Sequence, residues 1–172
     1  MTESVEFKEA MSFLAAAVCV VTTRVDEEVF GFTASSVCSV SADPPTMLVC
    51  VNRDSTSHTK LRLSGVLAIN VLASRHEALS RAFSSKLTPE ERFRHGNWIE
   101  LKTGSPILQD SLVSFDCNVE AVNEVGTHAI YICRVQGIRF GTSGQALLYY
   151  RRNYHCLEMT PEVSEARLEK IA

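Results

Sequence analysis

Strict two-residue alternation over residues 113–121 is the feature that most constrains the fold. Apolar residues and small or charged polar residues take turns along this segment, so one face is apolar and the other is polar. That period predicts a half-buried antiparallel strand. Further apolar and β-branched runs predict strands at 18–23, 29–41, 47–51, 67–72, 128–140 and 146–150. The run at 29–41 is either one long strand or a strand bent near residues 33–36.

The helices predicted from the sequence are short and few. Helical spacing of apolar residues predicts one over residues 5–17, and a Ser/Thr cap followed by Ser64-Gly65 predicts a second. Others are expected at 75–83, after the capping box at 88–91, and in the charged tail beyond Thr160. Many strands with few helices in 172 residues favour a mainly β fold, an antiparallel barrel in one domain spanning 1–172.

Composition excludes several classes of protein. A net charge of -3 argues against a nucleic-acid binder. The six cysteines form no C-x-x-C pair and sit mostly in apolar runs, as buried thiols do in a reducing compartment. The longest apolar run, 13–21, is too short to span a bilayer, and acidic residues precede it. We therefore expect a soluble, cytoplasmic protein that binds neither membrane nor nucleic acid.

Common catalytic and nucleotide-binding motifs are missing from the sequence. It has no G-x-G-x-x-G, no P-loop, no H-E-x-x-H and no G-x-S-x-G. The five histidines are scattered, so no metal site is expected. The candidate ligand site is therefore the stretch 31–58. There a small, hydroxyl-rich run precedes an apolar strand, and a capped helix start follows that strand.

The start of that helix could bind a phosphate, because free N–H groups and the helix dipole favour an anion there. The alternative is an ordinary hairpin followed by a solvated, capped helix. The residues alone leave both interpretations open.

Several runs in one order resemble the flavin reductase family, the small partner components of two-component flavin monooxygenases. These are GFTASSVCSVSADPPTMLVCVN, then S-x-S-H, AINVL, L-S-x-x-F, E-R-F, G-T-H and LLYYRR-x-YH. The resemblance extends from Gly31 to Tyr154. It implies a split β-barrel with Greek-key connections and short flanking helices, assembled as a homodimer with flavin near the interface.

The resemblance also implies roles for individual residues. The flavin ring and ribityl chain would lie against Thr33, Ala34, Ser35, Ser36, Cys38 and Ser39. The phosphate end would be held by Asn52, Ser55, Ser57 and His58, and Ala82 and Phe83 would close over the flavin. The catalytic His128 would sit near the nicotinamide dinucleotide, with Arg92, Tyr150 and Arg151 nearby.

The implied reaction is hydride transfer from NADH or NADPH to FAD or FMN, in which the cofactors carry the difficult chemistry. Reduced flavin would then leave for a separate monooxygenase acting on an aromatic substrate. Two alternatives share the barrel. One is a non-catalytic protein that binds flavin or haem. The other is an enzyme like pyridoxamine-phosphate oxidase, which should have a more basic phosphate site.

Overall fold

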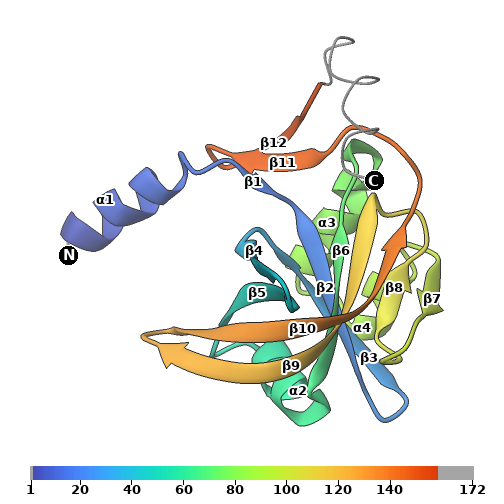
Figure 1. The fold of residues 1–172 in the computed structure, drawn as a ribbon. Helices are drawn as coiled ribbons and strands as arrows, with labels where there is room; N and C mark the ends of the chain where they lie inside the picture. Colours follow the sequence, from blue (N-terminus) through green and yellow to red (C-terminus); the bar gives the residue numbers. More distant parts are fainter. Residues whose placement is uncertain (1, 159–172) are drawn as a thin grey trace.

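A curled antiparallel sheet forms the body of the protein in the computed structural model, which describes residues 2–158 (Figure 1). The sheet has seven strands in the order β3-β2-β6-β9-β10-β5-β4. Their bounds are β2 (Cys19–Val25), β3 (Glu28–Ala34), β4 (Val37–Ala42), β5 (Pro45–Asn52), β6 (Val66–Val71), β9 (Val113–Val125) and β10 (His128–Phe140).

The two edge strands of this sheet follow one another in the chain. Only Ser35 and Ser36 join β3 to β4, and two residues span about 7 Å at most. The sheet must therefore curl until its edges meet at this seam. The prediction of a mainly β antiparallel barrel is confirmed, and the run at 29–41 is the bent alternative, split in two at Ser35-Ser36.

Smaller elements surround the barrel. They are α1 (Thr2–Met11), β1 (Ala16–Ala17), α2 (Thr56–Ser64), η1 (Ser74–His76), α3 (Glu77–Ser84), α4 (Pro89–Phe93), β7 (Trp98–Glu100), β8 (Pro106–Leu108), β11 (Leu147–Tyr150) and β12 (Asn153–Cys156). α1 projects from the body at the left of Figure 1, and the β11–β12 hairpin lies above the barrel. None of the helices among the described residues is long and apolar enough to cross a bilayer.

One predicted helix has the wrong end, and several short strands were not predicted. The helix predicted over 5–17 ends at Met11, where the Ser12 hydroxyl donates to the Glu9 carbonyl at 2.6 Å, and residues 16–17 pair with β11. The strand at 146–150 is followed by β12, and the short strands β7 and β8 were not predicted. The helix expected beyond Thr160 lies outside the described residues.

The polar face of β9 is only partly exposed to solvent. Ser114 and Asp116 are completely buried, although the alternation itself is observed. The Asp116 carboxylate accepts the Thr103 N–H at 2.9 Å and also the Thr103 hydroxyl, while the Ser114 hydroxyl donates to Asn70 at 2.8 Å. The loop and short strand at 101–108 cover this end of β9, and every buried polar group there has a partner, as burial requires.

The cysteines do not share one environment. Cys19, Cys117 and Cys133 are buried in the barrel core, and burial raises the pKa of Cys19 and of Cys133 to about 12. These thiols therefore stay protonated and unreactive. Cys38 and Cys156 are exposed, so the expectation of buried thiols is wrong for these two.

Candidate functional site

A first pocket, here called the Tyr154 pocket, opens where β3 ends beside α3 and the β11–β12 hairpin. Its volume is about 280 Å³, and it is lined by Val18, Thr33, Ser35, Arg81, Ser84, Tyr149, Arg152 and Tyr154. The Tyr154 hydroxyl lies 2.8 Å from the Ser80 hydroxyl, and the Arg81 guanidinium lies 4.8 Å from the Tyr154 ring centre. Aromatic faces and cationic groups together suit a planar, negatively charged ligand.

A second pocket, the Arg92 pocket, lies further back along β3. It measures about 160 Å³ and is lined by Phe30, Gly31, Thr56, Ser57, Leu87, Pro89 and Arg92. The Arg92 guanidinium donates to the Gly31 carbonyl at 2.8 Å and to the Ser85 carbonyl at 2.7 Å. These two bonds fix a positive charge beside Ser57 at the start of α2.

A third pocket, the His58 pocket, also adjoins the first turn of α2. It measures about 340 Å³ and is lined by Arg53, Asp54, His58, Gly126 and Thr127. Arg53 donates to the Gly126 carbonyl at 3.1 Å and pairs with Glu124 at 2.7 Å. Arg53 thus ties the segment before α2 to the turn between β9 and β10.

Local sequence explains why α2 begins where it does. The Ser55 hydroxyl accepts the His58 N–H at 3.2 Å and donates to the Asn52 carbonyl at 2.7 Å, while Gly65 ends the helix in a left-handed conformation. The N–H groups of Thr56 and Ser57 have no acceptor among residues 2–158. Thr56 and Ser57 line the Arg92 pocket, His58 next to them lines the His58 pocket, and an anion at this turn could bind both N–H groups.

The structure brings together part of the predicted flavin-lining run. Thr33 and Ser35 line the Tyr154 pocket, and the N–H groups of Ser35 and Ser36 have no acceptor within the described chain. The Ala34 side chain instead faces the core. Cys38 and Ser39 lie on the exposed strand β4 and line none of the three pockets.

Ala82 and Phe83 are buried in the core and line none of the three pockets. Phe83 is 1% exposed, and its ring centre lies 5.1 Å from that of Phe93 and 5.6 Å from that of Trp98. Both side chains belong to the buried core, and their closing over a flavin stays a prediction.

The residues expected near the nicotinamide are spread over three places. Arg92 lies beside Ser57 instead, while His128 is exposed at the start of β10, opposite Asn52. Tyr150 and Arg151 contact Phe13, with the Arg151 guanidinium 4.8 Å from the Phe13 ring centre. No contact joins these three places among the described residues.

Tyr154 and Arg152 are pocket residues that the sequence reasoning missed. Arg151 and Arg152 form the turn of the β11–β12 hairpin, with positive φ values of 47° and 63°. This turn pairs Tyr149 with Tyr154 and carries Arg152 to the pocket. A hairpin centred on the two arginines would have revealed that pairing, but neither central position of the turn holds the Gly or Asn that would indicate it.

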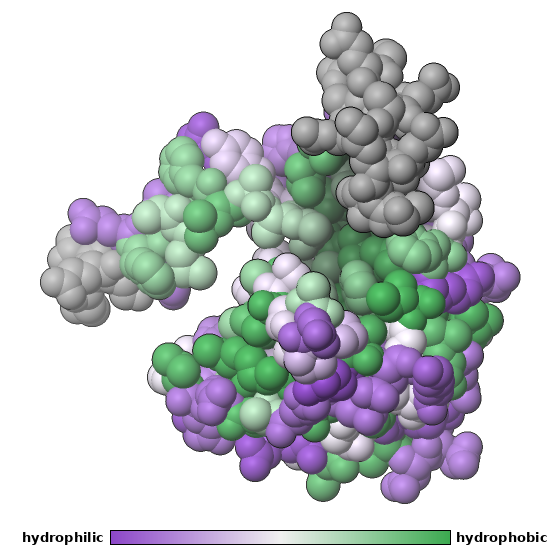
Figure 2. Space-filling view, viewed as in Figure 1, coloured by the Kyte–Doolittle hydropathy of each residue, from purple (hydrophilic) through white to green (hydrophobic). Residues whose placement is uncertain are grey.

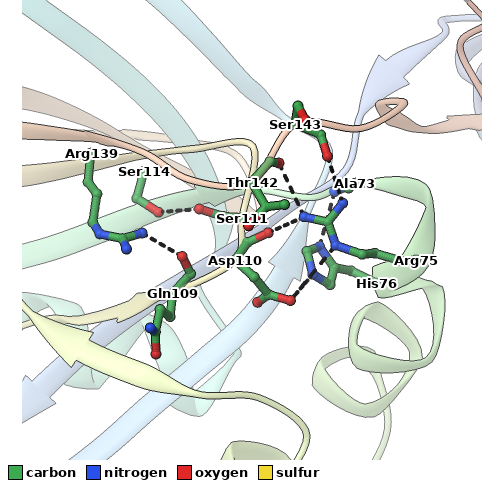
Figure 3. Close-up of polar contacts among 10 residues, drawn as sticks. All are labelled: Ala73, Arg75, His76, Gln109, Asp110, Ser111, Ser114, Arg139, Thr142 and Ser143. Carbon is green, nitrogen blue, oxygen red and sulfur yellow. Dashed lines mark hydrogen bonds and ion pairs between the residues drawn. The ribbon is translucent and has the colours of Figure 1, made fainter.

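A separate polar network holds η1 against the loops at 109–111 and 141–143 (Figure 3). His76 is buried, its Nδ1 accepts the Ala73 N–H at 3.1 Å, and its Nε2 donates to the Asp110 carboxylate at 3.1 Å. Arg75 donates to the Thr142 carbonyl at 3.2 Å and to the Ser143 carbonyl at 3.3 Å. These groups bond to one another and to backbone, so the network serves the fold.

Asp110→Asn is expected to reduce the loss of stability in acid by about 0.5–1 kcal/mol, because the carboxylate is half exposed. Burial raises the pKa of Asp110, but the hydrogen bond and charge of His76, with the charge of Arg75, outweigh it and lower the pKa. A lowered carboxyl pKa stabilises the fold at pH values above about 4, the ordinary pKa of an aspartate. That stability is lost as the pH falls through the lowered pKa.

Urea unfolding from neutral to acid pH measures this dependence. Asp26→Asn, at the exposed turn between β2 and β3, is the matched control. An unchanged pH dependence in Asp110→Asn would show that the pair with His76 contributes nothing to stability.

Comparison with known proteins connects these pockets to a protein family. The model of the family described as flavin reductase like domain matches residues 11–158. The FMN reductase (NADH) RutF 2 of Rhizobium rhizogenes is 46% identical over 152 residues, which cover 88% of each chain.

Two solved structures share the fold. The crystal structure of a protein from Haemophilus somnus, described as a flavin reductase, has a TM-score of 0.87 and 44% identity, covering 89% of this chain and 98% of that one. The styrene monooxygenase flavin reductase of Pseudomonas putida S12 has a TM-score of 0.81 and 26% identity, covering 90% and 99%.

Proposed function

Because this chain belongs to the flavin reductase like domain family and is an NADH-dependent flavin oxidoreductase with a split β-barrel, we propose that it supplies reduced FMN or FAD to a separate monooxygenase. The proposed monooxygenase acts on an aromatic substrate. This is supported by the flavin reductase of styrene monooxygenase, which is one of the solved structures similar to this chain. The names of the sequence relatives of this chain support FMN as the preferred flavin and NADH as the preferred hydride donor.

One observation carries this proposal: the two pockets along β3 are complementary to the two ends of a flavin nucleotide. The Arg92 pocket offers a fixed cation and the free N–H groups of Thr56 and Ser57, which suit a phosphate. The Tyr154 pocket begins at Thr33 and Ser35. From Gly31 to Ser35 a strand rises about 13 Å, a nucleotide-sized distance.

The chain contributes binding and charge stabilisation rather than acid–base chemistry. A flavin held along β3 would supply the hydride acceptor, and negative charge would develop on its ring during the transfer. We assign the free N–H groups of Ser35 and Ser36 to steadying that charge, as pre-oriented donors do at other sites of developing negative charge. Thr33 helps to hold this end of β3, because its hydroxyl donates to the Ser80 carbonyl at 2.6 Å.

We also propose that the active form is a homodimer. The projecting helix α1 and the segment after it leave Val5, Phe7, Met11 and Leu14 between 49% and 72% exposed, and Val40 on β4 is 51% exposed. Figure 2 shows apolar side chains along this helix and on the barrel. A second copy covering α1 and β4 would remove this apolar surface from water.

The test of the proposed function is NADH oxidation by the purified protein, followed by the loss of NADH absorbance. Turnover that requires added FMN or FAD is expected, with FMN the better acceptor. Flavin binding without turnover, with either NADH or NADPH, would contradict a reductase and favour a non-catalytic flavin-binding barrel.

His128→Ala is expected to slow NADH oxidation about tenfold while FMN affinity stays within twofold, because the exposed ring is proposed to position the dinucleotide and not the flavin. Steady-state kinetics and a flavin titration separate the two effects. His95→Ala, an exposed histidine in the loop after α4, is the control. A normal rate in His128→Ala would remove His128 from the mechanism.

A further inference from the structure

A buried tyrosine–histidine pair lies directly behind the first turn of α2. Tyr131 on β10 is fully buried, and its hydroxyl lies 2.9 Å from Nδ1 of His58 and 3.1 Å from the His58 carbonyl oxygen. The two rings meet edge to face, with centres 5.8 Å apart. His58 is 9% exposed, so its position is set by the core and not by solvent.

The hydroxyl of Tyr131 has one hydrogen for these two acceptors. Burial raises the pKa of Tyr131 to about 12, so the hydrogen is retained at physiological pH. If it goes to Nδ1 of His58, the neutral ring carries its own proton on Nε2. If it goes to the carbonyl, Nδ1 must carry the proton and Nε2 is a bare acceptor.

The Nε2 atom of His58 has no hydrogen-bond partner in the described part of the chain, and the ring lines the His58 pocket. Its other side is occupied by Tyr131, so Nε2 is the polar atom that remains for a ligand. The neighbouring Thr56 and Ser57 N–H groups are also free within residues 2–158. A buried side chain with an unused polar atom beside free helix N–H groups is what a phosphate site requires.

The charges around His58 are nearly balanced. Arg53 pairs with Glu124, which also lies 4.0 Å from Arg62 on α2, and the Asp54 carboxylate lines the same pocket. His128 follows Thr127 at the pocket's edge. A neutral donor fits this setting without adding another charge.

We propose that Tyr131 is a positioning residue, which donates to Nδ1 of His58 and so makes the neutral Nε2–H group a donor to a nucleotide phosphate at the first turn of α2. This role rests on the proposed function, because the phosphate is that of the flavin. It follows that phosphate recognition needs no protonated imidazole.

Tyr131→Phe removes the hydroxyl and keeps the ring. The KM for FMN is expected to rise about tenfold at pH 7.5, the effect of losing one good hydrogen bond to a charged group. The KM for riboflavin, which lacks the phosphate, should stay within twofold.

The matched control is Val49→Ala. Val49 is fully buried and lies opposite Tyr131 across the β5–β10 pair, so its loss disturbs the same part of the core without removing a hydrogen bond. The ratio of the two KM values should be unchanged in this control. An equal rise for FMN and riboflavin in Tyr131→Phe, or no rise for either, would overturn the proposal.

A second measurement does not depend on turnover. Nitrogen NMR of histidine-labelled protein, titrated with inorganic phosphate at pH 7.5, reports which ring nitrogen of His58 carries the proton. We expect the neutral Nε2–H form alone in the wild type and a mixture of the Nε2–H and Nδ1–H forms in Tyr131→Phe, where no hydroxyl fixes the tautomer. Observation of the Nδ1–H or doubly protonated form in the wild type would refute the role of Tyr131, even if the protein reduces flavin.

Discussion

Ser57→Asp is expected to weaken FMN binding by about thirtyfold to a hundredfold. Ser57 lies at the start of α2 beside the Arg92 guanidinium, where we place the flavin phosphate. Two like charges about 4 Å apart repel by about 4 kcal/mol at the effective dielectric of a protein surface, and salt reduces this to about 2–3 kcal/mol. An aspartate in the first turn stabilises the helix itself, so the loss of affinity should occur without loss of folding.

Fluorescence titration with FMN and with riboflavin measures this effect. Only FMN should lose affinity, since riboflavin has no phosphate to repel. Ser64→Asp introduces the same charge at the other end of α2 and is the matched control. Equal FMN affinity in Ser57→Asp and Ser64→Asp would move the phosphate away from the first turn of α2.

Gly141→Ala is expected to destabilise the protein by about 3–4 kcal/mol, or about 10 °C in Tm. A Cβ atom at position 141 would overlap the Ser111 carbonyl oxygen and lie 3.0 Å from its carbon. Both groups are backbone, and the Gly141 N–H donates to the Leu112 carbonyl at 3.1 Å, so neither strand end can move aside freely. Ser111 also belongs to the polar network around Asp110 (Figure 3).

Thermal and urea unfolding test this expectation. Gly137→Ala in β10 provides the comparison, because a Cβ atom there meets nothing nearer than 3.8 Å and should change stability by less than about 1 kcal/mol. If Gly141→Ala and Gly137→Ala are equally stable, the close approach at Ser111 does not constrain the fold.

Local patterns in the sequence predicted the elements whose conformation is locally determined. The alternation at 113–121 and the apolar run at 128–140 became β9 and β10, and the cap at Ser55 with Gly65 bounded α2. Burial could not be predicted in the same way. Ser114 and Asp116 look like surface residues in the sequence, because the alternation does not reveal that Thr103 and Asn70 bond to them and bury them.

The candidate site was partly predictable for the same reason. The first turn of α2 is a local structure, so Ser57 and His58 could be identified from the sequence. The Tyr154 pocket draws on β3, α3 and the β11–β12 hairpin, and its assembly depends on tertiary packing. The burial of Phe83 could not be predicted locally, because an aromatic residue near the end of a helix is equally compatible with a lid and with the core, and its neighbours Phe93 and Trp98 are brought to it only by the fold.

At the turn Arg151-Arg152, the stability of the fold and the positive charge of the Tyr154 pocket make opposite demands on the sequence. Two-residue hairpin turns with positive φ at both positions normally use Asn-Gly, and an ordinary side chain in that conformation costs about 1–2 kcal/mol. Laboratory evolution selecting only for thermostability would therefore favour Asn-Gly here. It would also remove the guanidinium that Arg152 brings to the Tyr154 pocket. Selection for thermostability and selection for activity would therefore favour different residues in this hairpin.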